Sequence, residues 1–118
     1  MNNNQIAAAL ILDVITSKIT VHDALNNFPK DDNDVNLKCA FDALMHYEAD
    51  EDIRKKSSQY AETQDEYLEF IAKILNSGKK LPKDIVARYY KYHQDNMNIG
   101  NEKGFRGFIN YIKRMINF

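Results

Sequence analysis

The chain is poor in the residues that interrupt helices and in those that cross-link a small fold. Its 118 residues include four glycines, two prolines, one cysteine and no tryptophan. Because glycine and proline dominate tight turns, their scarcity favours long helices over many short strands. The lone cysteine, Cys39, cannot form an intramolecular disulfide, which argues against a secreted disulfide scaffold.

Long hydrophobic runs are also missing. The longest, IAAALIL at positions 6–12, is shorter than the roughly 20 apolar residues that span a bilayer. No basic region precedes this run and Asp13 follows it, which is not typical of a secretory signal peptide. We therefore expect no membrane partner and a location in a reducing cytoplasm. An abundance of Asn, Lys and Ile favours an AT-rich bacterial source.

What the chain does have is helical periodicity of its hydrophobic residues along nearly its whole length. Its contents of 44% hydrophobic and 28% charged residues are ordinary for a globular protein. We predict that residues 1–118 form a single all-α domain, a compact bundle of five or six helices. The helices are expected at positions 4–17, 21–28, 35–48, 58–76, 82–95 and 104–117, with a further turn near Ile53. The first helix is apolar nearly all round, so we expect it to be buried centrally.

Residues that cap helices stand where this periodicity begins and ends. Thr20, Asp34 and one of Ser57 and Ser58 each precede a predicted helix, where a side-chain oxygen accepts a hydrogen bond from an unpaired backbone N–H. Gly78 follows the helix at 58–76, so we expect it in the left-handed conformation that ends many helices.

The charges are divided unevenly between the two parts of the chain. Residues 1–70 carry 14 acidic and 6 basic residues, whereas residues 71–118 carry 3 acidic and 10 basic residues. In one interpretation the two parts face each other inside the fold. In another they form an acidic and a basic surface for oppositely charged partners. Pairing between two copies of the chain, as a dimer, is a third interpretation.

Two groups of residues are candidates for partner binding. An acidic patch lies in the stretch HYEADED and comprises Glu48, Asp50, Glu51 and Asp52. A basic–aromatic set interleaves cations with an aromatic ring and comprises Arg88, Tyr90, Lys91, Arg106 and Lys113. Acidic patches steer basic partners, whereas basic residues beside aromatic rings are typical of phosphate contacts and base stacking.

The stretch KGFRGFINY, at positions 103–111, resembles the aromatic strand signature of RNA recognition motifs, and its GFRG resembles the GXXG loop of KH domains. Both families need a β-sheet around these motifs. The stretch fits a helix better, because its large apolar residues recur at helical spacing: Phe105, Phe108, Ile109, Ile112, Met115 and Ile116. We therefore predict an amphipathic closing helix, and nucleic-acid binding is the alternative function.

Catalytic and metal-binding patterns are weak. Asp42 and His46 are four residues apart, so they share one helix face, but the chain lacks the Glu-x-x-His pairs of di-iron bundles. The sequence leaves open whether these two residues bind a metal, and we assign no metal ligand and no cofactor. Cys39 lies beside an apolar stripe with no neighbouring base, so we expect a buried thiol rather than a nucleophile.

The weakness of catalytic and metal-binding patterns and the uneven distribution of charge along the chain together predict the class of function. We expect a non-enzymatic module that binds another protein or a second copy of itself, as an adaptor, regulator or inhibitor. The alternative is a nucleic-acid-binding module that uses the basic–aromatic C-terminal part of the chain, and the third reading is a metal-binding helical protein.

Overall fold

The structure is a computed structural model, and it describes the backbone of residues 1–95 and the side chains of residues 1–91. This part of the chain contains six helices and no β-strand, which confirms the all-α bundle. The helices are α1 (Asn3–Ile15), α2 (Val21–Asn27), α3 (Val35–Ala49), α4 (Glu51–Lys56), α5 (Ser58–Ser77) and α6 (Lys83–Asp95). The closing helix predicted at 104–117 lies outside the described residues.

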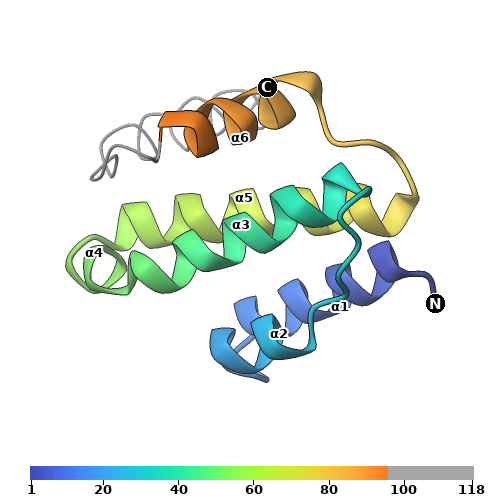
Figure 1. Ribbon diagram of the computed structural model, residues 1–118. Helices are drawn as coiled ribbons and strands as arrows, with labels where there is room; N and C mark the ends of the chain where they lie inside the picture. Colours follow the sequence, from blue (N-terminus) through green and yellow to red (C-terminus); the bar gives the residue numbers. More distant parts are fainter. Residues whose placement is uncertain (96–118) are drawn as a thin grey trace.

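The helices are arranged in three layers (Figure 1). Helices α3 and α5 lie side by side in the middle layer, with α1 and α2 on one side and α6 on the other. The most extensive packing joins α1 to α5, and α6 packs against α3. The short helix α4 connects the adjacent ends of α3 and α5, so these two long helices run antiparallel.

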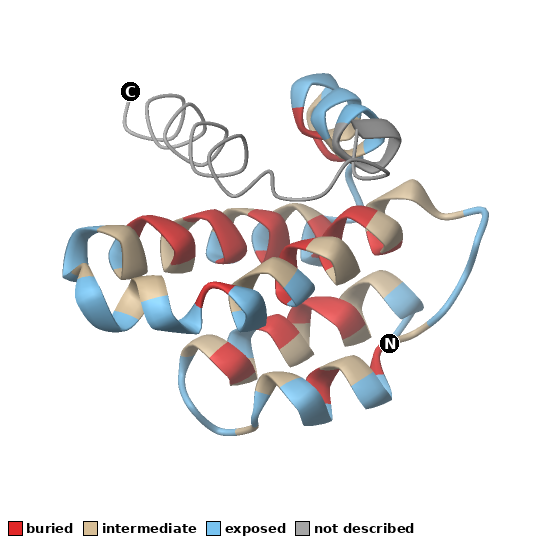
Figure 2. Cartoon of the chain, turned by 60° about the vertical axis from the view of Figure 1, so that its left-hand side comes forward, coloured by how far each residue is buried: buried red, intermediate tan, exposed pale blue. Residues whose placement is uncertain are grey.

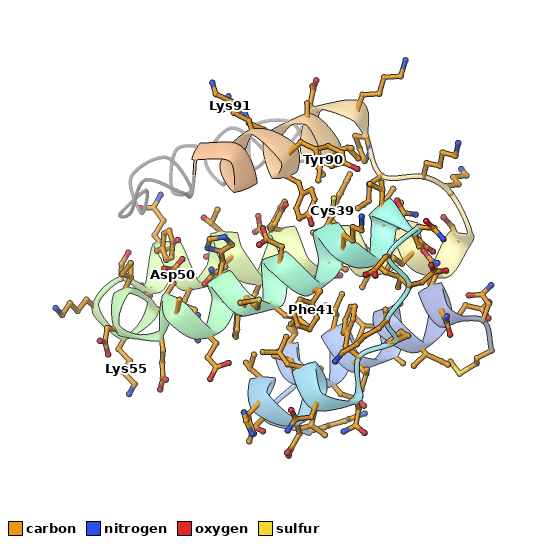
Figure 3. The ribbon with its side chains drawn as sticks, viewed as in Figure 1. Cys39, Phe41, Asp50, Lys55, Tyr90 and Lys91 are labelled. Atoms are coloured by element: carbon orange, nitrogen blue, oxygen red, sulfur yellow. The ribbon has the colours of Figure 1, made fainter. Side chains whose placement is uncertain are left out.

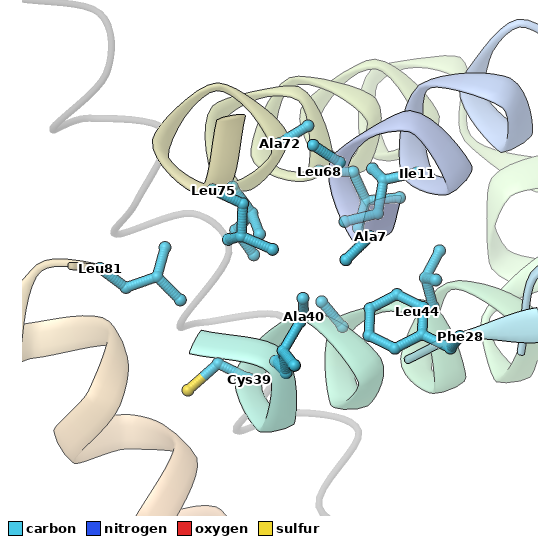
Figure 4. Close-up of a cluster of buried hydrophobic side chains, with 14 of the residues drawn as sticks. Ala7, Ile11, Phe28, Cys39, Ala40, Leu44, Leu68, Ala72, Leu75 and Leu81 are labelled. Atoms are coloured by element: carbon cyan, nitrogen blue, oxygen red, sulfur yellow. The ribbon is translucent and has the colours of Figure 1, made fainter. Parts of the chain in front are cut away.

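The core lies where α1, α3 and α5 meet (Figure 4). Small side chains on α1, Ala7 and Ala8, are almost fully buried and allow its backbone to approach α5 closely, where Leu68 and Leu75 have no exposed surface. Buried residues line the facing sides of these helices, and exposed residues lie on the outer sides (Figure 2). The first helix was predicted to be buried centrally, but it lies in an outer layer, and its Leu12 is 43% exposed.

The helix ends follow the predicted caps. The Thr20 hydroxyl accepts a hydrogen bond from the N–H of Asp23 at 3.0 Å, and Asp34 and Ser57 cap α3 and α5 in the same way. Gly78 has a φ of 76°, in the left-handed region. The cap of α1 was not predicted. Asn2 exchanges two hydrogen bonds with Gln5, a pattern of Asn followed by Gln three residues later that was readable in the sequence.

Candidate functional site

The candidate site is an apolar groove between α3 and α6. Its volume is about 390 Å³, and the loop after α2 closes one side. Apolar side chains from both helices line it, namely Leu37, Phe41, Met45 and Tyr89. Met45 is 50% exposed although it faces this apolar hollow. Half-exposed methionine is common at surfaces that adapt to a partner, because its unbranched side chain fills irregular gaps.

The floor of the groove is held in place from below. The ring of Phe41 meets the ring of Phe28 edge-on, with 5.6 Å between centroids, and Phe28 is only 4% exposed. Leu37 is 2% exposed and belongs to the main core. The groove therefore has a rigid floor formed by α3, whereas Met45 at its end is free to adjust to a ligand.

Charged residues of both signs surround the apolar floor. Lys30 and Asp32 lie on the loop after α2, and Lys38 and Asp42 lie on α3. The carboxylate of Asp42 is 3.5 Å from the Nε2 atom of His46, one turn further along α3. This mixed rim favours a partner that carries both signs of charge, with its orientation set by their order.

The α6 wall of the groove is aromatic. Burial, followed by the nearby charge of Asp42, raises the pKa of the Tyr89 phenol, so this group stays neutral. The Tyr89 and Tyr90 rings meet edge-on at 5.3 Å, and Tyr90 is 47% exposed. An edge-on pair of this kind holds both rings in defined positions.

The acidic patch is divided by the structure. Asp50 is only 5% exposed, because its carboxylate faces α5 rather than solvent (Figure 3). It accepts hydrogen bonds from the Tyr60 hydroxyl at 2.7 Å and from the Gln64 amide at 3.3 Å. Asp50 therefore stabilises the packing of α5, and the exposed members of the patch are Glu48, Glu51 and Asp52.

A polar corner formed by α3, α4 and α5 was not expected from the sequence. Arg54 lies 3.6 Å above the centroid of the Tyr47 ring, donates to the Tyr47 carbonyl oxygen, and donates to the Gln64 side chain at 3.0 Å. The same Gln64 amide binds Asp50, and it is 1% exposed. The signal in the sequence was Gln64 on the apolar stripe of α5, because a polar residue at a position expected to be buried needs hydrogen-bond partners.

The basic–aromatic set is partly described. Arg88, Tyr90 and Lys91 are all exposed on α6, and Lys91 points away from the middle layer in Figure 3. The structure brings these three residues together on one helix. Arg106 and Lys113 lie outside the described residues, so their place in the set stays a prediction.

A second hollow, polar in character, lies beside the first turns of α1, α3 and α6. Its volume is about 820 Å³, and Lys79, Lys80 and Lys83 line it together with Asp31. Asn36 builds its wall by donating to the Lys79 carbonyl at 2.9 Å and accepting from the Leu81 N–H at 3.0 Å. These bonds attach the α5–α6 connection to α3 and thereby set where α6 starts.

The described residues offer little for metal or thiol chemistry. Among the side chains that the structure describes, no group of three or more from His, Cys, Asp and Glu is placed to hold a metal ion. Cys39 is 4% exposed, and burial raises the pKa of its thiol to about 12. A thiol with such a pKa is almost wholly protonated near neutral pH and is a poor nucleophile.

Comparisons with protein-family models, with curated proteins and with solved structures found no match to this chain. Among the helices of the described part, none is both long enough and apolar enough to cross a membrane.

Proposed function

We propose that this chain is a non-enzymatic interaction module that binds an amphipathic helix of another protein in the groove between α3 and α6. The observation that carries the proposal is the half-exposed Met45 at the end of an apolar hollow with a rigid floor. Helices that bind in such grooves insert apolar residues at positions i, i+3 or i+4, and i+7. Phe41 and Met45, which both line the groove, are four residues apart on α3 and can receive two successive apolar residues of such a helix.

The charges around the groove define the chemistry of the partner further. Glu48 is exposed and lies three residues after Met45 on α3, and the exposed Glu51 and Asp52 follow at the start of α4. A helix that carries basic residues at the end lying over Met45 therefore meets acidic side chains there. Such charges act mainly on association rate and on orientation, while the apolar contact supplies most of the affinity.

The experiment is a selection of helical peptides from a displayed amphipathic library on the full chain. Selected peptides are then titrated against Met45→Lys and against Leu12→Lys. Met45→Lys should weaken binding about tenfold, the size of a moderate interface hot spot. Leu12 is 43% exposed and lies in the opposite layer, so Leu12→Lys is the matched control and should bind unchanged.

Two results would contradict the proposal. One is a library that yields no binder to the wild-type chain. The other is a set of binders whose affinities fall equally in Met45→Lys and Leu12→Lys, because the contact would then not involve the groove.

The exposed group on α6 favours a second candidate function, binding of single-stranded nucleic acid. Arg88 and Lys91 stand on the same helix as the half-exposed ring of Tyr90. We expect fluorescence anisotropy of labelled oligonucleotides to show affinity that falls steeply with salt and is lost in Arg88→Glu/Lys91→Glu. Absence of binding even at low salt would eliminate this candidate and leave the groove proposal untouched.

A further inference from the structure

Helix α6 contributes little to the hydrophobic core. Among its residues with described side chains, 83–91, Ile85 is buried, Val86 and Tyr89 are partly buried, and the others are exposed. Helix α5, by contrast, places seven buried side chains in the core. Helices α1 to α5 therefore keep most of the core without α6, so releasing α6 from α3 costs less free energy than unfolding the whole bundle.

The face of α3 that α6 covers is partly polar. Cys39, Asp42 and His46 are spaced three and four residues apart, so they share one face of α3. Burial, followed by Asp42 and Cys39, raises the pKa of the Tyr89 phenol, which places this residue of α6 beside that face. The Asp42 and His46 side chains are 17% and 14% exposed. Contact surfaces within a chain that include charged groups resemble those of transient complexes, and their two sides move relative to each other.

One asparagine fastens the start of α6 to α3. The Asn36 side-chain amide donates to the carbonyl oxygen of Lys79 at 2.9 Å, and its side-chain oxygen accepts from the N–H of Leu81 at 3.0 Å. Both partners belong to the short connection between α5 and α6, residues 78–82. This connection begins at Gly78, whose φ of 76° ends α5. Such a connection acts as a hinge when its few residues absorb the change in φ and ψ as a packed helix moves.

We propose that α6 is a hinged lid on α3, held closed by the two Asn36 hydrogen bonds, and that it opens as a unit to admit the partner helix to the groove. Tyr89 lines the groove from α6, so outward movement of α6 widens the groove. The lid concerns this chain alone, whereas the admission of a helix rests on the proposed helix-binding function. Because only the open form admits the helix, the apparent affinity is lowered in proportion to the fraction of chains that are open.

The single cysteine of the chain reports whether the lid opens. Cys39 is 4% exposed, and its sulfur points toward α6 (Figure 4). A maleimide in excess labels the thiol only when that side of α3 is uncovered, so the labelling rate at neutral pH measures the open fraction. We expect labelling of the wild type to be faster than global unfolding alone allows, with the free energy of global unfolding taken from a urea titration.

Two variants of α3 separate the opening of α6 from global unfolding. Asn36→Ala removes both hydrogen bonds to the connection and should speed labelling about tenfold. Asn36→Asp keeps the acceptor for the Leu81 N–H and loses the donor to Lys79, so its rate should lie between those of Asn36→Ala and the wild type. Leu44 is 0% exposed in the main core, so Leu44→Ala is the matched control. Its urea midpoint should fall while its labelling rate stays the same.

Either of two labelling results would overturn the lid: a rate that rises in Leu44→Ala in proportion to the lost stability, or a rate that Asn36→Ala leaves unchanged. Admission of a helix is tested with the peptides selected for the groove. Their affinity should rise in Asn36→Ala, by no more than the increase in the open fraction, and an unchanged or lower affinity would overturn this step. A library without binders contradicts the groove proposal alone, because the labelling experiment needs no partner.

Discussion

At the corner where α3, α4 and α5 meet, the charged side chain of Asp50 is buried and hydrogen-bonded, whereas in the groove between α3 and α6 the apolar side chain of Met45 is open to solvent. Asp50 at the corner is 5% exposed, and Met45 in the groove is 50% exposed. The two residues are only five positions apart. Residue type alone therefore does not identify a functional surface, because Asp50 helps to fix the bundle, whereas half of the Met45 side chain stays in water.

The largest predicted difference is between two neighbouring apolar residues of α3, the buried Leu44 and the half-exposed Met45. Leu44 is 0% exposed, so Leu44→Ala should lower the free energy of unfolding by about 3 kcal/mol, through lost burial and a new cavity. Met45→Ala should cost less than about 1 kcal/mol, because half of the side chain is already in water. Urea unfolding of the two variants measures both values. Equal losses would mean that Met45 is part of the core and not of a binding surface.

Within the corner, two aspartates of the same sequence patch should differ. Asp50→Ala leaves the Tyr60 hydroxyl and the Gln64 amide without their acceptor, so it should destabilise the fold by about 2 kcal/mol. Asp52 is exposed in the first turn of α4, and Asp52→Ala should cost about 0.5 kcal/mol through the helix dipole alone. Chemical unfolding at neutral pH tests the pair. A reversed order would show that the buried network does not stabilise the corner.

The smallest effect concerns the pH dependence of the corner. Burial raises the pKa of Asp65 above its ordinary value of 3.8, although the Tyr47 hydroxyl at 3.0 Å and Arg54 partly offset this. The folded chain therefore binds this proton more tightly than the unfolded chain. The contribution of Asp65 to stability is then greatest below pH 3.8, and it declines as the pH rises through the pKa of the folded state.

Asp65→Asn removes that decline. Relative to wild type, its free energy of unfolding should rise between about pH 3 and pH 7. Parallel urea titrations at the two pH values measure the difference. A relative loss of stability at neutral pH would show that the ionised carboxylate is stabilised by Tyr47 and Arg54 more than burial disfavours it.

Much of the fold was readable because helix signals are local. Thr20, Asp34 and Gly78 placed two helix starts and one helix end correctly, and the pair Ser57–Ser58 placed a third start, at which Ser57 is the cap. The charged segment around Ile53 was expected as a single turn and forms the helix α4. Short charged helices of this kind depend on packing against a neighbour, here α5, which the local sequence does not reveal.

The candidate site was less readable. Glu48, Asp50, Glu51 and Asp52 look equivalent in the sequence, and only their partners separate them. Asp50 is buried because Tyr60 and Gln64, ten and fourteen residues later, face it across the turn between α3 and α5. The groove was missed because Phe41 and Met45 follow the same helical stripe as core residues, and nothing in that periodicity says which part of the stripe another helix covers.

The all-α class, the helix boundaries within a few residues and the burial of Cys39 could be read from the sequence, because they depend on caps, periodicity and apolar neighbours close in the chain. The tertiary structure decided that Asp50 lies inside and that Met45 and Leu12 lie outside. Those outcomes depend on which helices pack together, and packing joins residues such as Arg54 and Gln64, or Asn36 and Leu81, whose contacts no local pattern encodes.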